Sequence, residues 1–493
     1  MSGNIKGLAG ETIIYGASTM LGRFLNWLLM PFYIRLLLPE EYGVVINIYG
    51  IISVLLVVFT YGLETGFFRF SAKESRNDVY KSSLWMIGST SLVLILVTEL
   101  ASGVISDYFY NGLYRNSIIL VSVIVAFDSF LAIPFAKLRL NNQALKFGCV
   151  KIVNILLNIG FNLLFLLLIP WLIKKSILGD SLINLYQKGN GVFYVILSNA
   201  LSSVLILVFF IKDLIQLQGK FNRRLLANIM NYSWPVLVVG ITGMLIQNSD
   251  KVLMPKLIKE NGFKELAVYG ANFKIGVLMS LFTQSFRFAF EPYFFKNQDR
   301  GNSSYAKIME YFIFFGVTIF LGVMLFLDLI NILLTPEYLY GNIIIPFVLV
   351  AQLFYGIYFN LSLWYKLTDK TIFGAFFGIG GTLITLFLLF ILIPQYGIIG
   401  GGISIMTGYG LMMVVSYFVG KKFYPVSYSL KRIGTIVLGG LVVYLFDFWI
   451  QLDASFYRFI FKGVIFVSYI VFFLLVNGNL VIKKNSKWLT LKL

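Results

Sequence analysis

The stretch GRFLNWLLMPFYIRLLLPEEYG, residues 22–43, is an apolar run that contains an arginine and an asparagine and is interrupted by a proline. A weaker copy, QNSDKVLMPKLIKENGFKELA, occupies residues 247–267. A shift of 224 residues places Pro31 on Pro255, and the same shift matches a second pair of prolines. The chain contains only 11 prolines, so two matches in one register indicate an internal repeat.

The composition is that of a chain that lies in a membrane. Hydrophobic residues make up 58% of the chain and charged residues 13%, about half the charged share of soluble domains. Each of fourteen apolar segments is near the length of about 20 residues that a helix needs to cross a bilayer. We therefore expect an all-α polytopic membrane protein with these spans: 11–36, 42–66, 82–105, 116–136, 148–170, 191–211, 231–256, 267–290, 308–334, 343–366, 371–393, 397–419, 431–451 and 457–477.

Six spans separate the two copies of the repeat. Because six is an even number, the two halves share one orientation and form a parallel pseudo-repeat. The sequence predicts two six-helix lobes and two additional helices. The domains expected are an N-terminal lobe at 1–211, a cytoplasmic linker at 212–230, a C-terminal lobe at 231–420, and helices 13 and 14 with a cytoplasmic tail at 421–493.

The distribution of basic residues predicts the orientation. With the N-terminus inside, 27 of the 40 Lys and Arg residues fall in inner loops and tails, and 10 fall outside. This bias follows the positive-inside rule and places both termini in the cytoplasm. The net charge of +18 therefore comes mainly from basic residues in the inner loops and tails. We expect a protein of the cell (inner) membrane and no nucleic-acid partner.

The chain lacks the side-chain patterns of an enzyme. It has no histidine and a single cysteine, and it shows no nucleophile–base pair, metal-ligand spacing or nucleotide motif. The loops are too short for a soluble catalytic domain. We expect no enzymatic activity, no catalytic residue, no metal site and no cofactor.

Arg23 lies near the middle of the first predicted span. Tyr15, Thr19, Arg23 and Asn26 recur at helical spacing and form one polar stripe. An arginine at mid-span costs roughly 2.5–3.5 kcal/mol on insertion scales, so it is expected to face water or a partner. Arg23 either binds an anionic headgroup in a central cavity or pairs with Asp128 in the fourth span.

Two other predicted spans contain candidate polar residues, namely three regularly spaced asparagines in one and a single lysine in the other. Asn154, Asn158 and Asn162 follow one another at intervals of four and lie on one helical face. They either line the cavity and bind sugar hydroxyls or form hydrogen bonds between packed helices. Lys274 either extends to the outer interface or supplies a second cation to the cavity.

Carboxylates within the spans are the candidates for ion coupling. Asp250, with Asn248 beside it, either binds Na⁺ or H⁺ or is neutralised by Lys251 or Lys256. Because the chain has no histidine, coupling to protons would run through carboxylates such as Asp128 or Asp250.

Four motifs together carry a family resemblance. They are PEEYG at 39–43, GLETGFFRF at 62–70, KLRLNNQALKFG at 137–148 and IPQYGIIGGGIS at 393–404. In this order they resemble bacterial polysaccharide-biosynthesis membrane proteins, the Wzx-type flippases of the MOP exporter superfamily. That superfamily also contains the MATE drug exporters and the MurJ lipid II flippases.

The resemblance implies a function and further site residues. Members of this family are expected to move polyprenyl-diphosphate-linked oligosaccharides across the membrane by alternating access, for O-antigen, capsule, exopolysaccharide or lipopolysaccharide biosynthesis. Arg23 matches the family's first-span arginine, Arg69 matches an arginine at the inner end of span 2, and Lys274 is a looser match. Membrane lipid, a polysaccharide polymerase and glycosyltransferases are the partners implied.

Three alternatives to this function stay open. The first is a MATE-type exporter of cationic drugs, which would be expected to have an acidic cavity. The second is a lipid II flippase, which would be expected to have several cavity arginines. The third is a scaffold of a polysaccharide assembly complex that does not itself transport.

Overall fold

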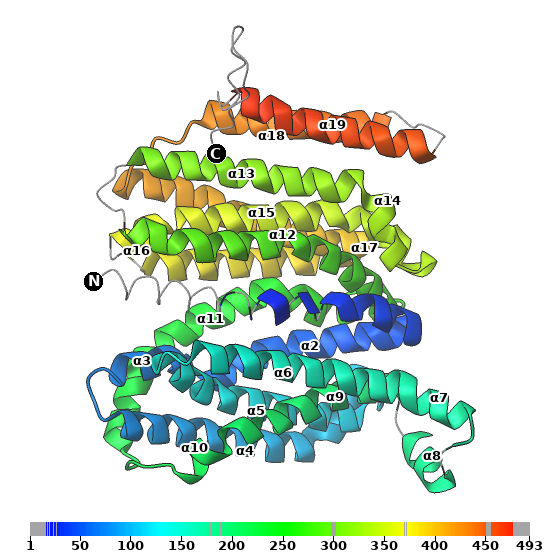
Figure 1. The fold of residues 1–493 in the computed structure, drawn as a ribbon, viewed down its shortest axis with the longest axis vertical. Coiled ribbons are helices and arrows are strands. Elements are labelled where there is room, and N and C mark those ends of the chain that lie inside the picture. The colour runs from blue at the N-terminus through cyan, green and yellow to red at the C-terminus, as the bar shows by residue number, and fades with distance from the viewer. Residues whose placement is uncertain are drawn as a thin grey trace. The chain divides into compact units, whose positions relative to one another are not determined.

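A computed structural model describes residues 16, 18, 20–22, 24–25, 27–177, 179–187, 190–296, 302–368, 370, 372–449 and 455–476. Within these residues the chain consists of helices joined by short turns and contains no β-strand (Figure 1). Eleven helical stretches are long and apolar enough to cross a membrane. The all-α polytopic fold predicted from the sequence is confirmed.

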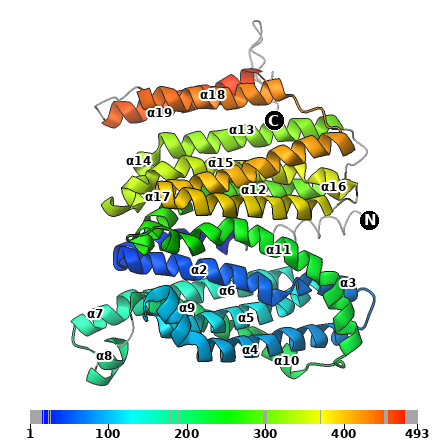
Figure 2. The same ribbon diagram turned by 180° about the vertical axis from the view of Figure 1, so that it is seen from behind.

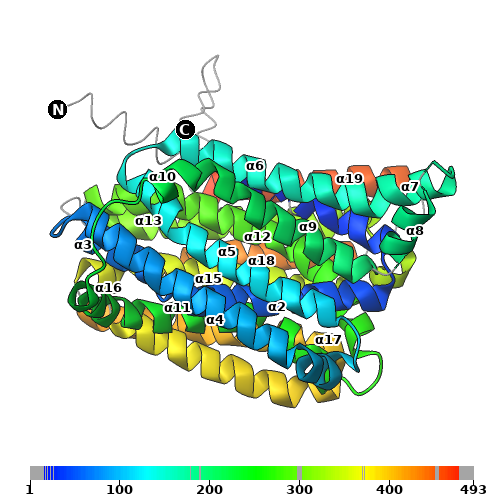
Figure 3. The ribbon, with the colours of Figure 1, turned by 90° about the horizontal axis from the view of Figure 1, so that it is seen from below.

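The chain divides into two compact units, and the first contains residues 1–271 and 378–404. Its helices include α5, which packs against α2, α4 and α9, while α6 packs against α9 (Figures 1 and 3). The helices lying wholly in this unit are α2 (Pro39–Thr60), α3 (Leu63–Phe70), α4 (Arg76–Tyr110), α5 (Arg115–Leu140), α6 (Ala144–Leu163), α7 (Ile169–Lys174), α8 (Asp180–Gln187), α9 (Gly191–Ile206), α10 (Ile211–Ile215) and α11 (Arg223–Leu257).

The second unit contains residues 272–377 and 405–493. Within it, α13 packs against α15, α18 and α19, and α18 lies beside α19 (Figure 2). Two of the helices, α12 and α17, have residues in both units. The helices with residues in this unit are α12 (Gly262–Lys296), α13 (Asn302–Leu325), α14 (Leu327–Ile330), α15 (Ile345–Leu361), α16 (Leu363–Leu367), α17 (Ile372–Phe423), α18 (Leu430–Trp449) and α19 (Ser455–Val476).

Every predicted span has helical residues in the described part of the chain. The first predicted span is helical at its described positions from 16 to 36, and the helix continues through Pro31. The predicted spans 371–393 and 397–419 both lie in α17, which is broken at Gly397. The lobe boundaries at 212–230 and 421 stay predictions, as does the orientation of the termini.

The break in α17 has a local cause. Gly397 has φ +55° and ψ −131°, a combination that side chains with a Cβ essentially do not adopt. It follows Pro394, which has no N–H to continue the helical ladder. The chain then turns back so tightly that a Cβ on Gly400 would overlap the Leu392 carbonyl. Pro394 and Gly397 thus divide one continuous apolar run into two spans.

Large apolar side chains cover the outer faces of the helices. On α4, Leu92, Val97 and Leu100 are 59%, 55% and 87% exposed. A soluble protein would bury such a row, whereas a bilayer supplies an apolar solvent for it. The outer surface of α4 is therefore the surface expected to meet lipid.

Candidate functional site

The polar stripe of the first span lies outside the described residues. Tyr15, Thr19, Arg23 and Asn26 are all outside them, so their binding role stays a prediction. Their described neighbours on this helix contact α6, because a Cβ on Gly22 would lie 2.7 Å from Ile155. The first helix and the asparagine-bearing helix α6 are therefore adjacent.

The asparagines of α6 divide into two kinds. The Tyr33 hydroxyl of the first helix donates to Asn162 Oδ1 at 3.0 Å, and Asn162 Nδ2 donates to Asn158 Oδ1 at 2.9 Å. Asn162 thus forms a hydrogen bond between helices, one of the two interpretations that the sequence offered, whereas its bond to Asn158 lies within α6. Asn154 is half-buried and makes no hydrogen bond to the described chain. Sugar binding by the stripe stays a prediction.

Asp250 lies in a fully satisfied buried cluster. Its carboxylate is completely buried, receives a hydrogen bond from Lys251 Nζ at 3.1 Å, and receives another from the Tyr269 hydroxyl at 2.6 Å. Lys251 Nζ also donates to the Gln247 carbonyl at 2.6 Å. The charge of Asp250 is therefore balanced by Lys251, one of the two interpretations given by the sequence. Asn248 instead donates back to its own helix, to the Met244 carbonyl at 3.1 Å.

Asp128 has a cation and a hydroxyl as neighbours inside the first unit. Its carboxylate is hydrogen-bonded to Ser203 on α9 and interacts electrostatically with Lys151 on α6. Asn199, one turn before Ser203, donates from Nδ2 to the Tyr49 hydroxyl of α2 at 3.2 Å. Four helices thus contribute polar groups to the region around Asp128. The predicted partner Arg23 lies outside the described residues, and the cation found near Asp128 is Lys151.

Lys151 is the residue that sequence reasoning missed. Counting charges assigned it to an inner loop, although it falls within the predicted span 148–170. In the structure it lies on α6 with its ammonium 4.3 Å from the centre of the Phe135 ring. Its position in the predicted span was the signal that could have identified it. In the structure, Lys151 lies seven residues after Ala144, where α6 begins.

Two of the motifs that carry the resemblance meet in a salt bridge. Arg139, in KLRLNNQALKFG, pairs with Glu64, in GLETGFFRF. The Arg139 guanidinium also lies 5.2 Å from the ring of Phe68 and 5.8 Å from the ring of Phe147. The pairing joins α3 to the C-terminal end of α5 and to the start of α6.

Arg69 is an exposed cation held by an aromatic ring. Its guanidinium carbon lies 4.0 Å from the centre of the Tyr232 ring on α11. Stacking on a ring fixes the plane of a guanidinium while its N–H edge stays free for an oxyanion. The binding role predicted for Arg69 stays a prediction.

Lys274 belongs to α12 in the second unit, where it is half-buried. Two residues before it, Asn272 is completely buried and donates from Nδ2 to the Tyr338 carbonyl at 2.8 Å. The remaining described candidates lie in the first unit. Among the described residues, no group of three His, Cys, Asp or Glu is placed to hold a metal ion.

Solved structures of transporters share this fold. A structure titled lipid II flippase MurJ, inward closed conformation, matches with a TM-score of 0.74 at 15% identity, covering 94% of this chain and 99% of that one. An inward-facing multidrug resistance MATE family transporter of the MOP superfamily matches with a TM-score of 0.60 at 15% identity, covering 84% and 96%. A MOP superfamily transporter from Pyrococcus furiosus matches with a TM-score of 0.56 at 14% identity, covering 87% and 97%.

The sequence itself assigns the family. The family model described as polysaccharide biosynthesis protein matches residues 8–298, which is more than half of the chain. No curated protein sequence matches the chain. The resemblance stated from the four motifs is confirmed, and the chain belongs to the polysaccharide biosynthesis protein family, with the fold of the MurJ and MATE transporters of the MOP superfamily.

Proposed function

We propose that this protein is a flippase that moves lipid-diphosphate-linked oligosaccharides across the cytoplasmic membrane by alternating access. The observation that carries the proposal is membership of the polysaccharide biosynthesis family on a transporter fold. The protein breaks no covalent bond in this function. It lowers the cost of moving a charged, sugar-bearing headgroup through the bilayer, while the polyprenyl chain stays in lipid.

Cations on the first unit support a diphosphate as the group recognised. Arg69 is exposed and stacked on Tyr232, and Lys151 lies among polar groups inside the unit. Arg23 on the first helix is the third cation proposed. Guanidinium and ammonium groups form their strongest hydrogen bonds with phosphate oxygens. Asn26 and the asparagines of α6 are proposed to bind sugar hydroxyls. Of the three asparagines of α6, Asn154 is the one that makes no hydrogen bond to the described chain.

Coupling to an ion is proposed to use the buried carboxylates. Asp128 and Asp250 each lie beside a lysine, so a bound proton or Na⁺ would change the balance of a buried ion pair. Asn248, two residues from Asp250, would supply an amide oxygen to such a cation. Lys274 is proposed as a cation of the second half of the transport path.

The experiment that tests the function reconstitutes this protein alone in liposomes with a fluorescent, polyprenyl-diphosphate-linked sugar. Time-dependent movement of the label to the opposite leaflet is the result expected. Labelled lipid that stays in place, with correctly inserted protein, would favour the scaffold alternative. Movement of a cationic dye without movement of the lipid-linked sugar would favour the MATE-type exporter.

Residue roles are tested by Arg23→Ala and Arg69→Ala in a strain that needs the protein for surface polysaccharide. Both variants are expected to make less polymer at normal protein levels, with Arg69→Lys retaining more than Arg69→Ala. Full polymer in both alanine variants would contradict the cationic recognition of the diphosphate. Localisation in the inner membrane, cytoplasmic termini, and association with a polymerase and glycosyltransferases belong to the same proposal.

A further inference from the structure

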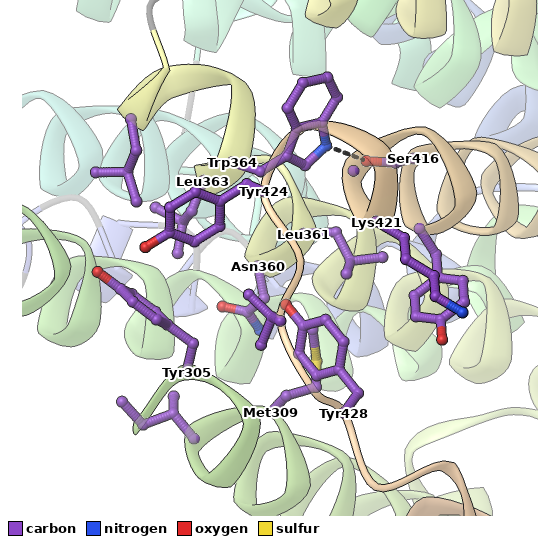
Figure 4. A pocket seen from close by; sticks show the side chains of 15 residues that line it. Tyr305, Met309, Asn360, Leu361, Leu363, Trp364, Ser416, Lys421, Tyr424 and Tyr428 are labelled. Carbon is purple, nitrogen blue, oxygen red and sulfur yellow. Dashed lines mark hydrogen bonds between the residues drawn. The ribbon is translucent and has the colours of Figure 1, made fainter. Parts of the chain in front are cut away.

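A small cavity lies within the second unit, among α13, α15, α16, the C-terminal end of α17 and the loop that follows it. Its volume is about 30 Å³, and its wall contains tyrosine, tryptophan, asparagine, serine and lysine side chains beside aliphatic ones (Figure 4). All of these residues belong to one compact unit. The transport function proposed above uses none of them.

The cavity contains an unsatisfied donor. Asn360 is only 9% exposed, and no described atom accepts a hydrogen bond from its Nδ2. Its amide lies between Tyr305 and Tyr428 in the cavity (Figure 4). A buried amide N–H without an acceptor costs free energy, so a water or a ligand atom is expected to accept from it.

The other polar side chains of the wall can also donate hydrogen bonds. Burial raises the pKa of Tyr428, with Tyr417 and Tyr424 adding to the effect, so its hydroxyl stays protonated. The Trp364 indole N–H donates to Ser416 Oγ at 3.4 Å, which leaves the serine hydroxyl free to donate in turn. Lys421 lies at the exposed rim, on the far side of Leu361 from Asn360 (Figure 4).

The chemistry of this wall favours an oxyanion over a sugar. The residues that line the cavity include no carboxylate, so no side chain of the wall repels an anion. The volume holds about two to three water-sized groups, which suits the oxygens of one phosphate and not a saccharide chain. A lysine at the rim adds the charge that a phosphate attracts.

The surroundings of the cavity favour a phosphate that is attached to a lipid. Aliphatic residues, Ile308, Leu363, Leu367 and Val426, form part of the wall. Phe418, next to the lining residue Tyr417, is 65% exposed on the lipid-facing side of α17. The same end of α17 carries Lys421 and Lys422. Basic pockets between helices at such an end bind anionic lipid headgroups.

We propose that the cavity around Asn360, Tyr428 and Lys421 binds the phosphate of an anionic phospholipid, whose acyl chains lie along the apolar surface of α17. The site is separate from the candidate residues for transport and does not rest on the proposed function. A bound phospholipid would hold the loop after α17 against α13 and α16.

The test measures phospholipid retention by the purified full-length protein in detergent, using native mass spectrometry. Phosphatidylglycerol is the anionic probe, phosphatidylcholine the zwitterionic one, and inorganic phosphate the probe without chains. Wild-type protein is expected to retain one phosphatidylglycerol about tenfold more tightly than phosphatidylcholine. Equal retention of the two phospholipids would overturn the proposal.

Variants locate the site and identify the source of the phosphate. Asn360→Leu is expected to weaken phosphatidylglycerol binding about tenfold, because it removes a hydrogen bond to a charged group. Lys421→Gln is expected to weaken it less, because the ammonium at the rim attracts the charge of the headgroup from the far side of Leu361. Lys422→Gln is the matched control, since Lys422 is the exposed neighbour that does not line the cavity. Equal losses in Lys421→Gln and Lys422→Gln would show a nonspecific surface effect and overturn the site.

Displacement of phosphatidylglycerol by equimolar inorganic phosphate would overturn the lipid assignment. Lys421 is exposed, so its variant remains informative if Asn360→Leu does not fold.

Discussion

Asn47 on α2 replaces a hydrogen-bond donor that Pro255 removes from α11. Pro255 has no N–H to donate to the Lys251 carbonyl four residues before it. Asn47 Nδ2 donates to that carbonyl at 2.8 Å and to the Val252 carbonyl at 3.3 Å. The Tyr110 hydroxyl of α4 donates to Asn47 Oδ1 at 2.7 Å. A proline of the internal repeat is thus accommodated by a side chain from another helix.

This arrangement predicts a rescue. Asn47→Leu removes the hydrogen bonds that Asn47 makes with the Lys251 carbonyl and the Tyr110 hydroxyl, so it is expected to destabilise the protein by about 2 kcal/mol or more. Adding Pro255→Ala restores a donor within α11 and should recover part of that loss, as measured by thermal unfolding in detergent. A double variant no more stable than Asn47→Leu would contradict the assigned role of Asn47.

The buried pair of Asp250 and Lys251 predicts an asymmetry between single and double variants. Asp250→Ala leaves a largely buried ammonium without its counter-ion, at an expected cost of about 3–5 kcal/mol. Asp250→Asn with Lys251→Gln removes both charges and is expected to cost less. Thermal unfolding of the three proteins measures this. An Asp250→Ala protein as stable as wild type would show that the pair does not stabilise the fold.

The two kinds of asparagine on α6 predict separable effects. Asn162→Leu breaks the bond from Tyr33 and is expected to lower stability by about 1–3 kcal/mol, because a buried hydroxyl loses its acceptor. Asn154→Leu breaks no hydrogen bond within the described chain, so it should leave stability nearly unchanged and slow the flipping of lipid-linked sugar in liposomes. Unchanged flipping in Asn154→Leu would remove this residue from the proposed sugar contacts.

Two glycines of α17 predict opposite responses to alanine. Gly397→Ala places a Cβ at φ +55° and ψ −131°, so it is expected to cost about 1–3 kcal/mol. Gly380→Ala is the control, because nothing lies within 4 Å of the new Cβ and alanine favours a helix by roughly 0.5–1 kcal/mol. Unfolding temperatures compare the two. A tolerated Gly397→Ala would mean that the turn between the two spans does not need a glycine.

Much of the fold was predictable from the sequence because its causes are local. Hydropathy marks a span within about 20 consecutive residues, and a proline or glycine breaks a helix where it stands. The two spans within α17 were separated in the prediction near Pro394 and are separated in the structure at Gly397. The family was likewise recognisable from four short motifs.

The candidate site was less predictable because its partners come from distant parts of the chain. Asp128 was expected beside a cation, but only the packing of α5, α6 and α9 brings Lys151 and Ser203 to it. The sequence predicted Lys251 as a partner for Asp250. The second partner, the Tyr269 hydroxyl, was not predicted, because it reaches Asp250 only through the turn from α11 back into α12.

The sequence by itself determined that this chain crosses a membrane many times, contains a repeat, and belongs to a transporter family. These conclusions follow from local hydrophobicity and from the order of short motifs. Only the tertiary structure decided which polar groups within the spans have partners in the protein. Asn162 and Asn154 share one helical face, and the difference between them comes from a tyrosine on a neighbouring helix. In an apolar medium each buried polar group needs a partner, and partners are assigned by packing between helices, which sequence spacing does not encode.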